Sequence, residues 1–306
     1  MELRSIGSLP VSVVGLGCNN FGMRIDYDAS ARVVDAALAA GITFFDTADI
    51  YGDTKSEEFL GRALANRRTQ AIVATKFGMR LDENRRGARP EYVRTAVEDS
   101  LRRLRTDYID LYQLHQPDPN VPIADTLGAL DALVKAGKVK QIGCSNFSAD
   151  QMDEAHRAAA PDGARFVSVQ NEFSLLHREP EREVLPACTR LGVAFLPYFP
   201  LASGLLTGKY VRGKGAPEES RLSLSWTARF TTAKNVAIAE ALQASAARRG
   251  HTLLELAMSW LAAHSQVASV IAGATSPDQV RANAAAVNWR LTPDDLTEID
   301  RLAQVS

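Results

Sequence analysis

Residues 108–146, YIDLYQLHQPDPNVPIADTLGALDALVKAGKVKQIGCSN, contain two strand candidates on either side of a helical stretch. YIDLYQLH (108–115) and VKQIGCSN (139–146) are short runs rich in apolar, β-branched and aromatic residues, which is typical of buried strands. The stretch between them has apolar residues at three- and four-residue steps, the spacing of one helix face: Ile123, Leu127, Leu130 and Val134. Two parallel strands need such a crossover helix, so the stretch predicts a β–α–β unit.

The same alternation runs along most of the chain. Its strand candidates are VSVVGLG (11–17), ITFFDTA (42–48), AIVATKF (71–77), YIDLYQLH (108–115), VKQIGCSN (139–146), FVSVQNEF (166–173), VAFLPYFP (193–200) and VASVIAGA (267–274). The first seven begin 27 to 37 residues apart, which leaves room for one helix in each interval. Their nearly continuous apolar character favours parallel strands buried on both faces. We therefore predict an α/β chain that forms one (β/α)8 TIM barrel domain over residues 1–306.

Several segments lie outside this repeat. Residues 2–9 carry Gly7 and Ser8 between short apolar pieces, and we expect them to form an N-terminal β-hairpin that closes the base of the barrel. The long interval before the eighth strand holds a Gly-rich loop and two helical stretches: residues 203–231, 232–249 and 252–264. Residues 277–286 and 293–303 begin with Pro after a Ser or Thr, which predicts two extra C-terminal helices.

A doubly wound dinucleotide-binding sheet is the competing fold. GLGCNNFG (15–22) is superficially similar to the glycine fingerprint G-x-G-x-x-G of that fold. The third glycine of the fingerprint would fall at position 20, which is Asn20. The match therefore fails, and the barrel remains the predicted fold.

The composition is that of a globular chain, with 46% hydrophobic and 23% charged residues. The 35 Lys and Arg residues balance 36 Asp and Glu residues without a long basic run, so we expect no nucleic-acid partner. Cys18, Cys144 and Cys188 have neither paired nor metal-ligand spacing, which predicts a reducing compartment and no structural metal. The N-terminus lacks a signal peptide, and the longest near-apolar run (36–45) is too short to cross a membrane. We predict a cytoplasmic protein without membrane contact, whose oligomeric state the sequence leaves open.

Polar residues stand at the carboxyl ends of the predicted strands, where a (β/α)8 barrel carries its active site. Asp46 lies in the second strand run and Tyr51 in the loop after it. Lys76 lies near the end of the third strand run and His115 ends the fourth. When a hydride reaches a carbonyl carbon, negative charge grows on the oxygen, which then needs a proton or hydrogen-bond donors.

These four residue types suit that reaction. Tyr51 can give the proton, and the ammonium group of Lys76 can make the phenol more acidic. Asp46 can hold Lys76 charged and in place, while His115 can donate to the carbonyl oxygen and orient it. The sequence therefore predicts a carbonyl reductase.

Structural interpretations exist for the same residues. Asp46 and Lys76 could form an ordinary buried ion pair, Tyr51 could pack against its turn, and His115 could be a hydrogen-bonded core histidine. Other residues of the predicted mouth could be turn formers or core residues: Ser145, Asn146, Gln170, Asn171 and Tyr198. Their joint occurrence at successive strand ends favours an active site.

The chain resembles the aldo-keto reductase family over essentially its whole length. The motifs that carry the resemblance are DTADIYGDTKSEEFLGRAL (46–64), ATKFG (74–78), YIDLYQLH (108–115), IGCSNF (142–147), VQNEFS (169–174) and YFPLASGLLTGKY (198–210). The branch of the family that it resembles most contains bacterial reductases and potassium-channel β-subunits. The resemblance implies a catalytic tetrad formed by Asp46, Tyr51, Lys76 and His115.

The resemblance also implies a nicotinamide cofactor, NADPH, and a set of residues that would hold it. Ser145, Asn146 and Gln170 would bind the nicotinamide carboxamide, and Tyr198 would stack on the ring. The backbone around Leu201, Ser203 and Leu205 would approach the pyrophosphate, together with Lys209 and Arg221. The implied contacts toward the adenosine end are Gly273, Thr275, Gln279 and Asn283. The partner is then a small-molecule carbonyl substrate.

The adenosine end departs from the pattern of the family. Many relatives carry Arg or Lys where this chain has Thr275, and that cation meets the 2′-phosphate of NADPH. Here the hydroxyl groups of Thr275 and Ser276, a helix N-terminus at Pro277, and Arg281 one turn further remain to bind the phosphate. We predict that NADPH is still preferred. Gln279 has a second interpretation, because Ser276 and Gln279 have the spacing of a capping box.

The predicted function is NADPH-dependent reduction of aldehydes or ketones by direct hydride transfer, with Tyr51 as general acid. An alternative is a redox-sensing NADP(H)-binding protein with little turnover, similar to the channel β-subunits. A third hypothesis is a Schiff-base aldolase that uses Lys76, but it gives no role to Tyr51 or to the Ser145-Asn146 pair.

Overall fold

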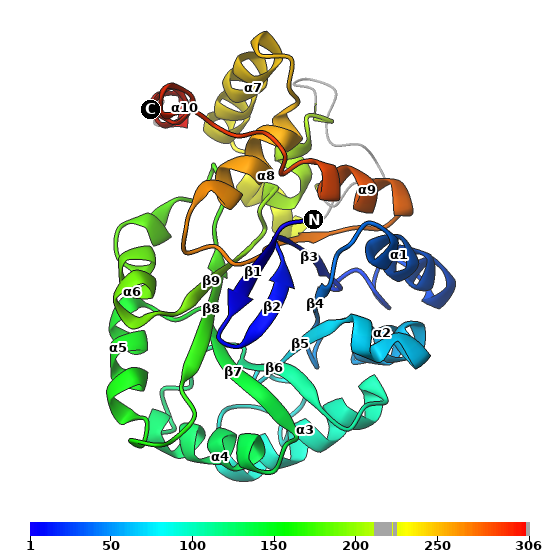
Figure 1. The fold of residues 1–306 in the computed structure, drawn as a ribbon, viewed down its shortest axis with the longest axis vertical. Coiled ribbons are helices and arrows are strands. Elements are labelled where there is room, and N and C mark those ends of the chain that lie inside the picture. The colour runs from blue at the N-terminus through cyan, green and yellow to red at the C-terminus, as the bar shows by residue number, and fades with distance from the viewer. Residues whose placement is uncertain (211–221, 223–224, 304–306) are drawn as a thin grey trace.

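The chain forms a nearly closed barrel of eight parallel strands inside a ring of helices (Figure 1). The computed structural model describes residues 1–210, 222 and 225–303. Around the barrel the strands follow the order β10 (Val270–Gly273), β3 (Val14–Gly17), β4 (Phe44–Asp46), β5 (Ile72–Phe77), β6 (Ile109–Leu114), β7 (Val139–Ser145), β8 (Phe166–Glu172) and β9 (Ala194–Tyr198). The two edges meet through a parallel bridge between Phe195 and Val267, where the Ala268 amide donates to the Phe195 carbonyl over 3.1 Å. The predicted (β/α)8 barrel is confirmed.

Helices cover the outside of the barrel between successive strands. They are α1 (Tyr27–Ala39), α2 (Lys55–Leu64), α3 (Pro90–Leu104), α4 (Ile123–Lys135), α5 (Ala149–Ala158), α6 (Val184–Leu191) and α8 (Leu253–Ala263), with short 3-10 helices at η1 (Ala65–Gln70) and η2 (Glu179–Glu181). The predicted stripe of α4 is on the inner face: Leu127 and Leu130 are buried, and Ile123 and Val134 pack against the same core. The hydrophobic core therefore lies between sheet and helices.

An N-terminal hairpin, β1 (Leu3–Ile6) and β2 (Leu9–Ser12), closes the base of the barrel (Figure 1). Ile6 and Val11 are fully buried and pack in one cluster with interior strand residues such as Phe44 and Leu111. The hairpin was expected over residues 2–9, so its predicted end was too early.

The first strand candidate, residues 11–17, is in fact two elements. Val11 and Ser12 belong to β2, and the barrel strand β3 begins at Val14. Ser12 marks the change, because its hydroxyl accepts from the Thr43 amide over 2.9 Å and donates to the Val14 carbonyl over 2.6 Å. One apolar run thus leaves the hairpin and enters the barrel wall, a change that periodicity alone does not reveal.

The chain after β9 carries the remaining helices. These are η3 (Ala202–Thr207), η5 (Ser225–Phe230), α7 (Ala233–Arg248), α9 (Pro277–Ala285) and α10 (Pro293–Ala303). In Figure 1, α7 and α10 lie together outside the barrel ring. Arg249 joins the two through ion pairs with Asp295 and Glu298. The additional C-terminal helices occur within a residue or two of the predicted bounds.

Candidate active site

A buried ion pair stands at the carboxyl ends of β4 and β5. The Nζ atom of Lys76 lies 2.6 Å from Oδ2 of Asp46 and 2.9 Å from the carbonyl oxygen of Thr47. Lys76 is completely buried, and Asp46 is 3% exposed. Two amides donate to the other carboxylate oxygen of Asp46, Gln170 over 2.9 Å and Gln113 over 3.4 Å. The carboxylate is therefore satisfied on both oxygens, as a buried charge requires.

The surroundings of Lys76 keep its side chain protonated. Burial acts to lower the pKa of the Lys76 ammonium. The charge of Asp46, the phenol of Tyr51 and hydrogen bonding to both residues act in the other direction and outweigh burial. The pKa of Lys76 is accordingly raised above its ordinary value, and the side chain is a cation at neutral pH.

Tyr51 lies beside this ion pair, on the loop between β4 and α2. Its ring centre is 5.1 Å from Nζ of Lys76 and 5.8 Å from the ring centre of His115, to which it is nearly perpendicular. The next residue, Gly52, has a φ of +59°, and a Cβ atom there would lie 2.3 Å from the carbonyl oxygen of Phe21. Only glycine fits this position, so the local sequence Tyr-Gly fixes the turn that presents Tyr51.

His115 follows β6 and faces the same cavity as Tyr51. Burial and the nearby charge of Lys76 lower the pKa of His115 to about 3. Its Nδ1 atom has no hydrogen-bond partner among the described residues. At neutral pH His115 is therefore an uncharged imidazole, which retains one N–H donor.

A second buried carboxyl group, Asp49, lies two residues before Tyr51 on the same loop. Asp49 is 1% exposed, and its amide donates to the Lys76 carbonyl over 3.1 Å. Burial and the charge of Glu57 raise the pKa of Asp49 to about 7, although Arg103 partly opposes the shift. The sequence analysis missed Asp49 and Gln113, since both lie within segments that contain a stronger candidate.

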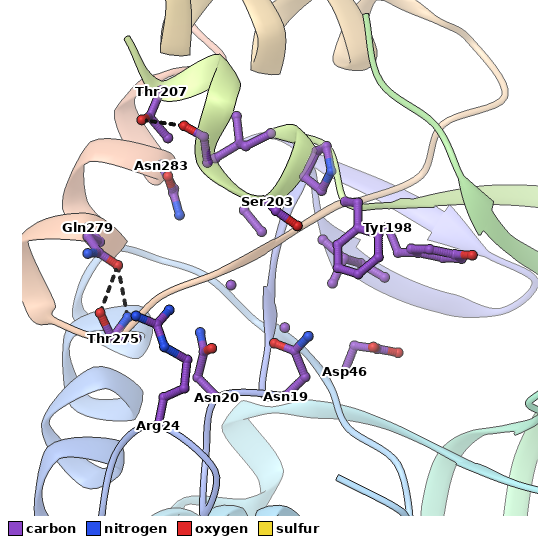
Figure 2. A pocket seen from close by; sticks show the side chains of 18 of the residues that line it. Asn19, Asn20, Arg24, Asp46, Tyr198, Ser203, Thr207, Thr275, Gln279 and Asn283 are labelled. Carbon is purple, nitrogen blue, oxygen red and sulfur yellow. Dashed lines mark hydrogen bonds between the residues drawn. The ribbon is translucent and has the colours of Figure 1, made fainter. Parts of the chain in front are cut away.

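The barrel mouth opens into a cavity of about 930 Å³, a size typical of cofactor and ligand sites (Figure 2). Asp46, Tyr51 and His115 line it, whereas Lys76 is fully buried next to them. The predicted cofactor contacts that line it are Ser145, Asn146, Gln170, Tyr198, Leu201, Ser203, Lys209, Gly273, Thr275, Gln279 and Asn283. The cavity thus joins the residues predicted for chemistry with those predicted for the cofactor.

The predicted nicotinamide contacts form one hydrogen-bonded group. The Tyr198 hydroxyl donates to Oδ1 of Asn146 over 2.8 Å, and the Asn146 amide donates to the His115 carbonyl over 2.9 Å. The Ser145 hydroxyl donates to the Gln170 carbonyl over 2.7 Å. Asn146 has a φ of +62°, so its side chain is turned by a left-handed backbone that Asn tolerates better than most residues. The amide nitrogen of Gln170 is directed at Asp46, and Gln170 therefore contacts the ion pair as well.

The loop after β9 has an unusual backbone at the cavity wall. Phe199, Ala202 and Ser203 all have φ between +46° and +57°, a region that costs energy for residues with a side chain. The Ser203 hydroxyl is buried without a hydrogen-bond partner in the described part of the chain. Such strain and such an unused polar group are typical of a loop that contacts a ligand.

The predicted pyrophosphate contacts differ in their placement. Leu201, Ser203 and Lys209 line the cavity. The side chain of Leu205 is 2% exposed and packs in the core, so only its backbone, for which the contact is predicted, is left to approach the pyrophosphate. Arg221 lies outside the described residues.

Thr275 and Gln279 are bonded to each other at the far end of the cavity (Figure 2). Oε1 of Gln279 accepts from the Thr275 amide over 2.9 Å and from its hydroxyl over 3.3 Å. The Ser276 hydroxyl accepts from the Gln279 amide, which is one half of the capping box. The Gln279 side chain reaches Thr275 and not the amide of Ser276, so the reciprocal half of the box is absent.

The structure does not support the predicted role of Arg281 in binding the 2′-phosphate. Arg281 forms an ion pair with Asp278, three residues earlier on the exposed face of α9. It is not among the described residues that line the cavity. A nearby carboxylate on the same helix competes for the guanidinium group, as is usual for this spacing. Arg24, which the sequence analysis did not select, lines the cavity close to Thr275 (Figure 2).

Two further features concern metals and membranes. No group of three or more His, Cys, Asp or Glu side chains suited to a metal ion occurs among residues 1–210, 222 and 225–303. All three cysteines are buried free thiols. Within the same residues, no helix has both the length and the apolar character needed to cross a membrane.

Comparisons with known proteins agree with this fold. The model of the aldo/keto reductase family matches residues 13–304. A probable aldo-keto reductase 1 of Glycine max is 37% identical over 300 residues, which cover 94% of this chain and 84% of that protein. The solved holo form of aldo-keto reductase AKR11C1 from Bacillus halodurans is 34% identical, with a TM-score of 0.84 over 100% of this chain and 97% of the other. The glycerol dehydrogenase AKR11B4 from Gluconobacter oxydans is also 34% identical, with a TM-score of 0.85 over 98% of this chain and 94% of the other.

The chain is therefore an oxidoreductase built on a (β/α)8 barrel. It belongs to the aldo-keto reductase family, whose members act on small carbonyl substrates with a nicotinamide cofactor.

Proposed function

We propose that this protein reduces aldehydes or ketones to alcohols with NADPH, by direct hydride transfer and with Tyr51 as the general acid. The observation that carries the proposal is the fully buried Lys76 ammonium, which contacts both Asp46 and Tyr51. A cation held next to a phenol stabilises the phenolate and so makes the phenol a better acid.

The cavity fits a nicotinamide dinucleotide. Its volume of about 930 Å³ suits a ligand of that size, and it extends from His115 to Asn283. The buried hydroxyl of Ser203, which has no partner among the described residues, is suited to hydrogen-bond a ligand at the middle of the cavity. When bound, the nicotinamide supplies the hydride that the carbonyl carbon accepts.

Tyr51 completes the reaction at the carbonyl oxygen. As the carbon accepts the hydride, the oxygen becomes negative and takes the phenolic proton of Tyr51. Lys76 stabilises the resulting phenolate until a proton from solvent restores it. Asp46 keeps Lys76 charged and positioned, while Gln170 and Gln113 fix the carboxylate of Asp46.

His115 orients the substrate in this proposal. Because its pKa is about 3, His115 is neutral under ordinary conditions and is unsuited to be the acid. A neutral imidazole can donate its N–H to the carbonyl oxygen and place that oxygen next to Tyr51. Tyr51 and His115 both line the cavity with their ring centres 5.8 Å apart, so both residues can lie next to one substrate in this proposal.

The other two hypotheses receive less support. A Schiff-base aldolase needs a neutral lysine amine as nucleophile, whereas the pKa of Lys76 is raised and its ammonium is bound to Asp46. A redox-sensing protein predicts tight NADP(H) binding with little turnover. Steady-state kinetics distinguish it from a reductase.

The test uses NADPH deuterated at the reactive carbon of the nicotinamide, with a panel of aldehydes, ketones and keto-sugars. We expect absorbance of NADPH to fall with substrate and the deuterium to appear on the former carbonyl carbon of the alcohol. Deuterium that is lost to solvent would exclude direct hydride transfer. Tight binding of NADPH without turnover on any substrate of the panel would favour the sensor.

A further inference from the structure

NADPH differs from NADH only in the 2′-phosphate on its adenosine ribose, so a preference requires a group that recognises this phosphate. Thr275 offers a hydroxyl but no charge at the end of the cavity where the adenosine would bind. Arg281 forms an ion pair with Asp278, which itself lines the cavity, but Arg281 is not among the described lining residues. Neither residue therefore supplies a cation inside the cavity.

Two Lys or Arg side chains line the described part of the cavity, Lys209 and Arg24. Lys209 follows η3, on the side of the cavity formed by the loop after β9. Arg24 comes from the turn after β3, and its side chain extends toward Thr275 and Gln279 (Figure 2). The position of Arg24 makes it the cation at the adenosine end.

The turn that carries Arg24 is fixed to the strand that leads to Thr275. The Asn20 carbonyl accepts from the amides of Met23, Arg24 and Ile25 over 2.8 to 3.3 Å. The Asn20 side chain in turn donates to the Ala274 carbonyl over 3.2 Å. Asn20 therefore holds the turn of Arg24 through its carbonyl and binds Ala274, the neighbour of Thr275, through its side chain. The two segments are about 250 residues apart in the chain.

Gly273 allows this close approach. A Cβ atom on Gly273 would lie 3.2 Å from the side-chain nitrogen Nδ2 of Asn20, which is tighter than an ordinary contact. It would lie 3.5 Å from Oδ1 of Asn19. Glycine at the end of β10 therefore lets the Asn20 turn pack against the strand. Asn20 and Gly273 line the same cavity as Arg24 and Thr275.

Asn20 also presents an unused acceptor. It is 4% exposed, and its Oδ1 atom has no hydrogen-bond partner within the described residues. A buried acceptor in a cavity wall requires a donor from a ligand or water. The ribose hydroxyl and the amino group of an adenosine are such donors. The adenosine end therefore combines an acceptor with a cation.

We propose that Arg24 binds the 2′-phosphate of NADPH and determines the cofactor preference, with Asn20 as the residue that positions its turn. The guanidinium group supplies the positive charge that Thr275 lacks at this end of the cavity. The Thr275 hydroxyl and the N-terminus of α9 complete the site. This inference rests on the proposed function, because it takes a nicotinamide dinucleotide as the ligand of the cavity.

The test measures the affinity of NADP⁺ and NAD⁺ by calorimetry for wild type, Arg24→Gln and Arg24→Lys, with Arg281→Gln as the matched control. Arg24→Gln should lower the affinity for NADP⁺ roughly 10- to 100-fold, as expected for the loss of one charge-assisted contact. The affinity for NAD⁺ should stay within about twofold of wild type. Arg24→Lys should recover part of the loss, because it retains the charge without the planar fork. Arg281→Gln should leave both affinities unchanged.

The same experiment separates the possible failures. An equal loss of NADP⁺ and NAD⁺ in Arg24→Gln would assign Arg24 to the pyrophosphate and overturn the inference. Unchanged NADP⁺ affinity in Arg24→Gln would also overturn the inference about Arg24. In either case, turnover of NADPH by the wild-type protein would leave the proposed function intact. Wild-type protein that binds neither dinucleotide would overturn both.

Discussion

The ammonium group of Lys76 lies 2.6 Å from the carboxylate of Asp46, with both side chains almost completely enclosed by the barrel. A buried ion pair contributes little to stability by itself, because desolvation offsets most of the attraction. Its value here is that it keeps a cation next to the phenol of Tyr51. This arrangement leads to the first two predictions.

Tyr51→Phe should lower kcat by about 10²- to 10⁴-fold, the usual contribution of a general acid, because the ring remains and the proton donor is lost. The affinity for NADPH should stay within about twofold. Single-turnover kinetics and a binding titration measure the two quantities. A variant that keeps more than about a tenth of wild-type kcat, with chemistry rate-limiting, would contradict the role of Tyr51.

Lys76→Met should lower kcat to a similar extent and also shift the pH dependence, because the charge that acidifies the phenol is gone. It should reduce the free energy of unfolding by about 3 to 5 kcal/mol, since Asp46 is left buried without its partner. The double variant Asp46→Asn/Lys76→Met should recover stability but not activity. An unchanged pH–rate profile in Lys76→Met would count against the proposed role of the lysine.

His115 should make the protein less stable in acid. Its folded pKa of about 3 lies below the unfolded value of about 6.5, so the unfolded chain binds a proton that the folded chain rejects between these values. The free energy of unfolding should therefore fall by roughly 2 kcal/mol from pH 7 to pH 5 through this residue. Urea unfolding of His115→Gln should show a smaller fall than wild type, whereas the exposed His156→Gln should behave like wild type.

Asp49 should make the protein less stable as the pH rises, the opposite of the effect of His115. Its folded pKa of about 7 lies above the ordinary value, so the folded state favours the protonated carboxyl group and loses stability as the pH rises toward and through 7. Asp49→Asn should therefore stabilise the protein by roughly 2 to 3 kcal/mol more at pH 8 than at pH 5. Asp53→Asn, in the exposed part of the same loop, is the control. An equal effect of Asp49→Asn at both pH values would show that the carboxyl group does not titrate between them.

Gly52→Ala should displace the loop that carries Tyr51. Gly52 and Gly250 both have positive φ, but a Cβ atom at Gly52 would collide with the Phe21 carbonyl, whereas nothing lies within 4 Å at Gly250. Gly250→Ala should cost only about 1 kcal/mol and keep kcat. Gly52→Ala should cost more and lower kcat at least tenfold, a split that thermal unfolding and steady-state kinetics can measure. Equal effects of the two substitutions would mean that the close contact with Phe21 is unimportant.

Much of the fold follows from local patterns. Alternating apolar runs and helical stripes, such as that of residues 123–134, predict the barrel because each pattern depends on neighbours along the chain. The place where the first run divides, at Ser12, depends instead on hydrogen bonds to Thr43 and Val14. The sequence analysis therefore found the strands but placed the end of the hairpin incorrectly.

The residues at the barrel mouth could also be proposed from the sequence. Parallel strands of a barrel have their carboxyl ends on one side, so Asp46, Lys76 and His115 had to come near one another once the strands were assigned. The distances between them, the amides of Gln113 and Gln170 on Asp46, and the neutral state of His115 were not predictable in this way. They depend on burial and on which side chains reach the centre of the barrel.

The sequence by itself determined the barrel, its family and the candidate residues at the ends of its strands, because periodicity and motif spacing are local properties of the chain. Only the tertiary structure decided which arginine lines the cavity close to Thr275. Arg281 has a carboxylate three residues away and turns to it, while Arg24 is brought to Thr275 by the hydrogen bond between Asn20 and Ala274. Such a choice depends on distances across the closed barrel, which no local pattern contains.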